Sequence, residues 1–236
     1  TLPADGFVDI AMYVGVREHV LRQYWPAFTL EDSTGLAWND PNLLPPRWHK
    51  EPPDTQYWPP DEYAQWARHL TLFPGTPPGQ YQLMGVVFDK DSKRFASLLD
   101  EQGSAVAPRF ALGALTVTRP ARPFALEPEI AAPHDFGPVA LLGYNLNRIT
   151  ANAGDSMLLT LYWKSELATQ TDYTARVGLL TPDGAPAFDV AMPPVNAYPI
   201  SEWRPGDEWR GQHRLQLPAT LAAGYYQLFI TLLGET

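Results

Sequence analysis

Short runs of apolar, aromatic and β-branched residues recur along the chain, and turn residues separate them. The clearest of these runs are residues 157–163, 173–180 and 226–232. In the first and the last run, apolar side chains recur at every second position, which is the period of a half-buried strand. Glycine ends the turns at 32–35 and 182–184, where it can adopt a positive φ. The pattern predicts an all-β chain, in which residues 61–70 could form one short helix.

The chain contains an internal repeat at an offset of 145 residues. From Trp58 to Leu83, eight of 26 positions are identical to the positions 145 residues later, without a gap. Average composition would give about one or two identities by chance. The anchors of this repeat are the pairs Trp58/Trp203, Gly79/Gly224 and Tyr81/Tyr226. The equivalent places of these tryptophans and tyrosines favour packing in the core or at a corner.

A second block of similarity lies upstream, at an offset of 149 residues. Its identities are Tyr13/Tyr162, Tyr24/Tyr173, Leu30/Leu179 and Gly35/Gly184. Both blocks keep the same order, so we expect two tandem antiparallel β-sandwiches, immunoglobulin-like or carbohydrate-module-like, at residues 1–120 and 121–236. The linker at residues 119–123 contains two prolines and is expected to be semi-rigid.

The two repeats differ at their ends. The second has a predicted strand at 139–146 that the first lacks, and the first continues through predicted strands at 94–99 and 110–117. The sequence therefore predicts a missing leading strand in the first repeat and a missing trailing strand in the second. An unpaired sheet edge is a template for another strand. We expect strand pairing near residues 7–14 or 226–233, with another copy of the chain or between the two modules.

Composition narrows the choice of partners. The 236 residues carry a formal net charge of −9, and such an acidic field repels phosphate backbones, so nucleic acid and anionic lipid surfaces are not expected partners. Cysteine is absent, which excludes disulfides and thiolate chemistry. No apolar run approaches the ~20 residues of a membrane-spanning helix. No signal peptide is recognisable and the chain starts and ends abruptly, so we expect a fragment of a longer protein that does not itself insert into a membrane.

The second repeat carries a series of turn and strand motifs. They are Gly154-Asp155, Leu161-Tyr162-Trp163, Pro182-Asp183-Gly184, Tyr198-Pro199, Trp203-Arg204-Pro205-Gly206, Leu217-Pro218 and Gly224-Tyr225-Tyr226. This series resembles the extracytoplasmic β-sandwich modules of large bacterial membrane proteins similar to integral-membrane glycosyltransferases of the protein mannosyltransferase type. The resemblance covers the second repeat and the second half of the first. The first repeat departs from the pattern near its start, where it has Met12-Tyr13-Val14 in place of Leu-Tyr-Trp.

The resemblance implies a location outside the cytoplasm, in the cell envelope or secreted. It also implies a non-catalytic accessory role, in spacing, docking or weak glycan binding for a larger envelope protein. No catalytic residues carry over, because the transferase chemistry belongs to the membrane-embedded part of such proteins. The partners implied are a glycan or flanking domains of the same polypeptide.

No motif for catalysis, a metal or a cofactor stands out. The five histidines lie outside metal-ligand spacing, so structural or surface roles are expected for them. The adjacent acid pairs are Glu31-Asp32, Asp61-Glu62, Asp100-Glu101 and Asp207-Glu208. Two facing carboxylates would make a glycoside hydrolase the alternative function, but adjacency in sequence does not create that geometry. The segment 89–92 lacks the glycine and the distant glutamate of a calcium loop, so a hairpin turn is favoured there.

Aromatic residues give the candidate ligand site. The change of offset from 149 to 145 leaves the first repeat with four extra residues between Gly35 and Trp58. The candidate glycan contacts in this proline-rich segment are Trp48, Tyr57, Asp54 and Arg47. An apolar platform with a few polar groups beside it suits a small ligand such as a sugar ring. Two alternatives stay open: Trp48 covers the edge of the sandwich, or the region is a structural spacer without a ligand.

Overall fold

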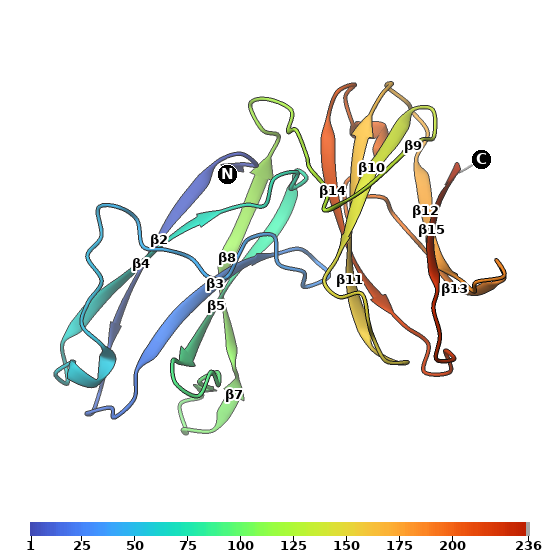
Figure 1. Ribbon diagram of the computed structural model, residues 1–236. Coiled ribbons are helices and arrows are strands. Elements are labelled where there is room, and N and C mark those ends of the chain that lie inside the picture. Colours follow the sequence, from blue (N-terminus) through green and yellow to red (C-terminus); the bar gives the residue numbers. More distant parts are fainter. Residues whose placement is uncertain (235–236) are drawn as a thin grey trace. The chain divides into compact units, whose positions relative to one another are not determined.

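The computed structural model describes residues 1–234, and their regular structure is almost entirely β (Figure 1). The all-β prediction is confirmed. The chain divides into two compact units: the first contains Thr1–Phe73 and Pro78–Pro120, and the second contains Pro74–Pro77 and the chain from Ala121 onward. The helices of the described residues are two short 3-10 turns, η1 (Thr55–Tyr57) and η2 (Ile200–Glu202). No helix in this part of the chain has the length and apolar character that a membrane span requires.

The first unit is built from antiparallel strands, apart from one short parallel pairing of β1 with β8. Its strands are β1 (Leu2–Pro3), β2 (Phe7–Gly15), β3 (Tyr24–Glu31), β4 (Tyr63–Thr71), β5 (Gly79–Asp89), β6 (Leu98–Leu99), β7 (Ala105–Ala107) and β8 (Arg109–Thr118). One sheet has the order β1-β8-β5-β3, a second pairs β2 with β4, and β6 and β7 form a hairpin. The sheet β1-β8-β5-β3 and the sheet β2-β4 both contribute to the interior, because Phe28 and Leu30 of β3 and Trp66 and Leu70 of β4 are buried.

The second unit consists of two antiparallel sheets. Its strands are β9 (Ile130–Asp135), β10 (Val139–Leu146), β11 (Ser156–Ser165), β12 (Tyr173–Leu180), β13 (Pro186–Met192), β14 (Glu208–Gln216) and β15 (Gln227–Gly234). Its sheets have the strand orders β14-β11-β10-β9 and β13-β12-β15 (Figure 1). The two sheets share one buried cluster, to which Trp163, Val177 and Trp209 belong. Two antiparallel sheets around one core are consistent with a β-sandwich.

The two sequence offsets reappear in the strand pairing. β2 pairs with β4 starting at Phe7↔Thr71, and β11 pairs with β14 starting at Ser156↔Gln216. A shift of 149 carries residue 7 to residue 156, and a shift of 145 carries residue 71 to residue 216. The same two shifts convert the register of β3 with β5 into that of β12 with β15. Both units therefore contain the same four paired strands in the same register.

The tryptophans that anchor the repeat occupy the same local structure. Trp58 follows η1, Trp203 follows η2, and both side chains are buried. Each indole N–H donates to the carbonyl oxygen five residues earlier, from Trp58 to Pro53 at 2.6 Å and from Trp203 to Tyr198 at 3.2 Å. A buried indole N–H needs such a partner. The same hydrogen bond thus closes the same chain reversal in each unit.

The two equivalent tyrosines of the repeat differ in how much of each side chain is buried. Tyr81 lies within β5 and is buried against Trp38, with the ring centroids 6.0 Å apart. Tyr226 lies just before β15, is half-buried and donates its hydroxyl to the carbonyl oxygen of Ala222. β8 lies beside β5, whereas β15 pairs with β12 alone among the described residues. The second unit is therefore more open at this strand.

Strand β2 lacks a neighbour that its counterpart β11 has. β11 lies between β14 and β10, whereas β2 pairs only with β4 in residues 1–234. Leu159, Leu161 and Trp163 of β11 are fully buried, but the residues at the matching positions of β2, Ile10 and Met12 among them, are only half-buried. The absence of a second neighbour leaves apolar side chains and backbone groups uncovered along one edge of β2.

Two expectations about local structure are wrong. The proposed helix at residues 61–70 is instead the strand β4, which pairs with β2 along its whole length. Trp66 and Leu70 of this strand face the interior, so tertiary pairing overrides the local helix signal. The strand expected at 94–99 is reduced to the two residues of β6, because the chain turns and forms only an isolated bridge between Phe88 and Phe95.

We expect the open edge of β2 to cause concentration-dependent self-association. In Met12→Lys an inward-pointing charge on this edge should remove the association, since such charges protect natural edge strands. Leu21→Lys, in an exposed loop, is the matched control and should associate as the wild type does. Sedimentation velocity from the micromolar to the millimolar range measures the effect. A wild-type chain that stays monomeric throughout contradicts the prediction.

Candidate functional site

A groove with a volume of about 730 Å³ opens on one face of the sheet β1-β8-β5-β3 in the first unit. Its floor is apolar and comes from two paired strands: Trp25 and Ala27 of β3 lie opposite Phe88 and Val86 of β5. Side chains alternate between the faces of a strand. The floor residues therefore face away from the interior that Phe28 helps to fill. Residues 41–44, the turn after β5 and the start of β8 form the walls.

Cations gather around this apolar floor. Arg68, Lys90, Lys93 and Arg109 line the groove with a single acid, Glu31, although the whole chain has 17 Lys+Arg against 26 Asp+Glu. The Arg109 guanidinium pairs with Glu31, and Arg68 pairs with a glutamate outside the groove at 2.5 Å. Lys90 and Lys93 form no ion pair with any described residue. They carry the excess positive charge of the groove.

The indole of Trp25 is the aromatic centre of the floor. The Lys90 ammonium nitrogen lies 4.5 Å from the centroid of the Trp25 ring, and the Arg68 guanidinium carbon lies 6.0 Å from it. A cation within about 6 Å of a tryptophan ring is attracted by the ring quadrupole. Two cations therefore already contact the aromatic surface of this site.

Side chains cap the edge of β3 beside the groove. The Asn39 side chain is buried and accepts the N–H of Leu30 at 2.6 Å. Its amide group also donates to the carbonyl oxygen of Phe28 at 3.1 Å. The Thr55 hydroxyl accepts the N–H of Tyr24 at 2.9 Å, and Pro26 has no N–H. Alternate residues of an antiparallel strand direct their backbone groups to the same edge. This edge therefore offers few free backbone groups to another strand.

The turn at residues 89–94 holds Lys90 and Lys93 beside the floor. Asp89 ends β5, and its side chain is only 7% exposed. Its carboxylate accepts two backbone N–H groups of the turn, at 2.9 and 3.2 Å, and the Arg22 guanidinium at 2.7 Å. The N–H of Lys93 donates to the carbonyl oxygen of Asp89 at 2.9 Å, with φ of Lys93 at 57°. One buried carboxylate thus organises the turn that carries both lysines.

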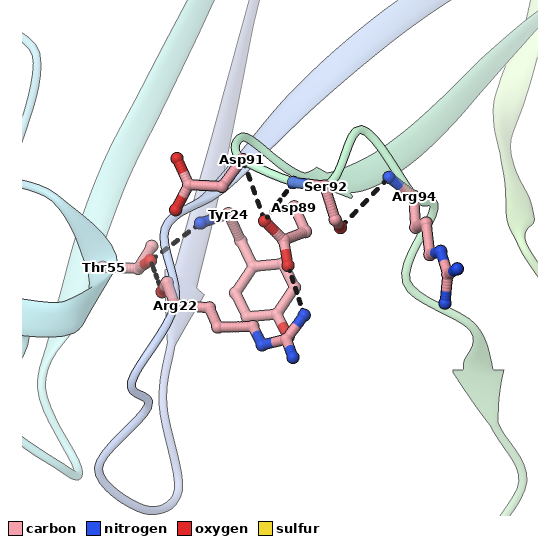
Figure 2. A network of polar contacts seen from close by, with 7 residues as sticks. All are labelled: Arg22, Tyr24, Thr55, Asp89, Asp91, Ser92 and Arg94. Carbon is pink, nitrogen blue, oxygen red and sulfur yellow. Dashed lines mark hydrogen bonds and ion pairs between the residues drawn. The ribbon is translucent and has the colours of Figure 1, made fainter.

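A hydrogen bond from Arg22 perturbs the titration of Asp89. The Arg22 guanidinium lowers the pKa of this carboxyl from 3.8 to about 2, helped by the N–H groups of the turn. Figure 2 shows the Asp89 carboxylate between the Arg22 side chain and the backbone of the turn. Thr55 fixes the bend before β3 that carries this arginine, because its hydroxyl donates to the carbonyl oxygen of Arg22 at 2.8 Å. The turn, the start of β3 and η1 are therefore tied together by polar contacts.

The four predicted glycan contacts lie elsewhere. None of Trp48, Tyr57, Asp54 and Arg47 lines the groove. Trp48 is 61% exposed, Tyr57 and Arg47 are exposed, and Asp54 is half-buried. Among the described residues, no hydrogen bond or ring contact joins Trp48 to the other three.

Trp48 lies at the exposed face of the β2–β4 sheet. Its indole N–H donates to Asp9 at 3.1 Å, and the other oxygen of this carboxylate lies 2.7 Å from the ring of His69. Phe7 contacts the same histidine, with ring centroids 4.6 Å apart. The hydrogen bond from His69 lowers the pKa of Asp9, and the bond from Trp48 adds to the shift. This patch is a polar and aromatic surface rather than part of the core.

Acids of two of the adjacent pairs, Glu31-Asp32 and Asp207-Glu208, take part in turns and in an ion pair. Asp32 accepts the N–H of Thr34 at 2.8 Å, and Asp207 accepts the N–H of Arg204 at 2.7 Å. Glu31, in the groove, is paired with an arginine. Residues 1–234 contain no group of three or more His, Cys, Asp or Glu side chains that could hold a metal ion.

The groove was not predicted from the sequence. Its lining comes from separated segments, at residues 25–31, 41–44, 68, 86–95 and 108–109. One signal was present: two of the four lysines of an acidic chain, Lys90 and Lys93, lie in a single turn beside Arg94.

Searches against protein-family models and among curated proteins found no match to this chain.

Trp48→Ala should change the free energy of unfolding by less than about 1 kcal/mol, as exposed substitutions usually do. The same variant is expected to weaken glycan binding on a glycan array. Trp38→Ala is the matched control: this tryptophan is fully buried, and the loss should reach about 3–5 kcal/mol. Chemical denaturation gives both values. A loss for Trp48→Ala as large as that for Trp38→Ala would place Trp48 in the core and remove it from the candidate site.

Asp89→Asn should destabilise the first unit in a pH-dependent way. The folded pKa of Asp89 is lowered to about 2, so its contribution to stability is fully present above the ordinary value of 3.8 and is lost as pH falls through about 2. The difference in unfolding free energy between wild type and variant should therefore shrink across this window. Asp91→Asn, in the same turn, is the control and should show a smaller difference. A difference for Asp89→Asn that stays constant down to pH 2 contradicts the prediction.

Proposed function

We propose that this chain is a non-catalytic accessory region of two tandem immunoglobulin-like β-sandwiches that binds a small ligand in the groove of its first unit. The observation that carries the proposal is the groove itself: a volume of about 730 Å³ over an apolar floor, with a few polar and charged groups around it. Ligand pockets typically have volumes of about 300–1,000 Å³ and a mostly apolar lining with a few polar groups.

The common framework of the units supports the immunoglobulin-like assignment. Each unit has the same four paired strands in the same register, and the second unit has two antiparallel sheets around one core. Immunoglobulin-like sandwiches have this two-sheet architecture, often with a buried tryptophan between the sheets. Trp163 of β11, fully buried in the shared cluster of the second unit, has such a position.

The location that we propose is extracytoplasmic. It rests on the resemblance of the turn motifs to modules of large bacterial envelope proteins. In that setting the region acts as a spacer or docking element for a larger protein, and the groove adds a ligand to this role. Glycan contact at Trp48, Tyr57, Asp54 and Arg47 stays a separate prediction.

The chemistry of the groove supports binding over catalysis. Hydrolysis of a glycosidic bond needs two carboxyl groups across the scissile bond. The groove is lined by one carboxylate, that of Glu31, which accepts from the Arg109 guanidinium and from the Thr29 hydroxyl at 2.6 Å. A carboxylate with these two partners is occupied, and the lining supplies no second one.

Filling the floor should abolish binding. A fragment library that includes neutral sugars and small acids is screened against the wild-type chain by ligand-observed NMR. Ala27→Trp and Val86→Trp place an indole on the floor and should remove the signals of the bound fragments. Ala114→Trp is the matched control, since Ala114 is exposed and does not line the groove. Fragments that bind equally to the wild type and to both filled variants would overturn the proposal, as would the absence of any bound fragment.

A further inference from the structure

The first step toward the ligand is the shape of the apolar floor. Trp25 and Phe88 lie opposite one another across the paired strands, and Ala27 and Val86 continue the same surface. Leu43 of the neighbouring loop adds an apolar wall. Such a surface is favourable for a hydrocarbon body, whose burial gains roughly 25 cal/mol for each Å² of apolar surface removed from water.

The second step is the sign of the charge at the rim. Arg109 and Arg68 are neutralised by glutamates, whereas Lys90 and Lys93 are not. An acidic chain with a formal charge of −9 repels anions in general. Two unpaired ammonium groups beside an apolar surface reverse this preference locally, so an anionic group is the chemical complement of the rim.

The backbone supports a role for the Lys93 side chain. This residue has a φ of 57°, a conformation in which glycine is the least strained residue. A non-glycine residue keeps such a conformation only where its surroundings hold it there, and here the N–H of Lys93 donates to the carbonyl oxygen of Asp89. The turn therefore presents a lysine where a glycine would fold at lower cost.

Two other occupants fit the groove less well. An added peptide strand would need free backbone groups along β3, but Asn39, Thr55 and Pro26 cap or remove those groups. A neutral sugar would need acceptors for its hydroxyl groups, and the side chains that line the groove are mostly apolar or cationic. The one carboxylate that could accept sugar hydroxyls, Glu31, is engaged by Arg109.

We infer that the groove binds an amphiphilic anion: a single hydrocarbon chain that carries one phosphate or carboxylate group. The chain lies on the floor of Trp25 and Phe88, and the anionic group lies between the ammonium groups of Lys90 and Lys93. This inference rests on the proposed ligand-binding function and specifies the chemical class of its ligand.

Calorimetric titration of the whole chain tests the inference with four probes below their micellar concentrations. Dodecyl phosphate and dodecanoate carry both features, dodecyl maltoside has the chain without the charge, and inorganic phosphate has the charge without the chain. The first two should bind with one site, at least about tenfold more tightly than the last two. Their affinity should fall with added salt, because the lysines are solvent-accessible. The relative affinities of the two anions show which head group the rim prefers.

Variants assign the binding to the rim and the floor. Lys90→Gln with Lys93→Gln should weaken both anions by about tenfold and should leave dodecyl maltoside unchanged. Lys50→Gln, which removes an exposed lysine outside the groove, is the matched control and should bind as the wild type does. Circular dichroism of each variant confirms that it is folded.

The outcomes separate this inference from the function on which it rests. Equal or tighter binding of dodecyl maltoside, lost in Ala27→Trp, would overturn the anionic class while supporting a ligand-binding groove. Binding of the anions that persists in Ala27→Trp, or in the double lysine variant, would overturn the inference. Absence of binding by every probe would overturn it as well, and a fragment screen without groove binders would then overturn the proposed function.

Discussion

Each unit depends on two antiparallel ladders whose register is the same in both. The pairings of β2 with β4 and of β3 with β5 recur as β11 with β14 and β12 with β15. In a strand the side-chain period is two, so a slip of one residue would move every core side chain to the solvent face. The ladders therefore fix which residues are buried. The indole hydrogen bonds of Trp58 and Trp203 close the chain reversals that lead into β4 and β14.

The units differ in what is added beside these ladders. β10 completes the cover of β11, and β8 completes the cover of β5, but neither addition occurs in both units of the described chain. The burial of equivalent residues follows: Leu161 is fully buried on β11, while Met12 at the matching position of β2 is half-buried. The exposure of an apolar side chain here depends on the neighbouring strand rather than on its own sequence position.

The groove arises from a similar difference. In the second unit β13 pairs along β12, whereas the chain after β3 leaves the sheet after a single bridge between Glu31 and Ala37. Side chains such as Asn39 then satisfy the strand edge in place of a neighbouring backbone. Residues 41–44 of this loop form a wall of the groove, and the turn organised by Asp89 lines it with lysines. An irregular loop in one unit thus occupies the place that a strand occupies in the other.

The sequence by itself determined the all-β class, the repeat and the hairpin turn at residues 89–92, because these depend on local periodicity, local turn chemistry and the comparison of one segment with another. It also placed Trp58 and Trp203 in equivalent positions, but it suggested a helix where β4 pairs with β2. The groove could not be predicted in this way. Trp25, Arg68, Lys90 and Arg109 are distant in the chain and line one groove because the pairing of β3, β5 and β8, the path of the loop after β3 and the approach of β4 bring them together. Only the tertiary structure decides such a site, since the free energy that assembles it comes from backbone pairing and core burial rather than from the residues of the site.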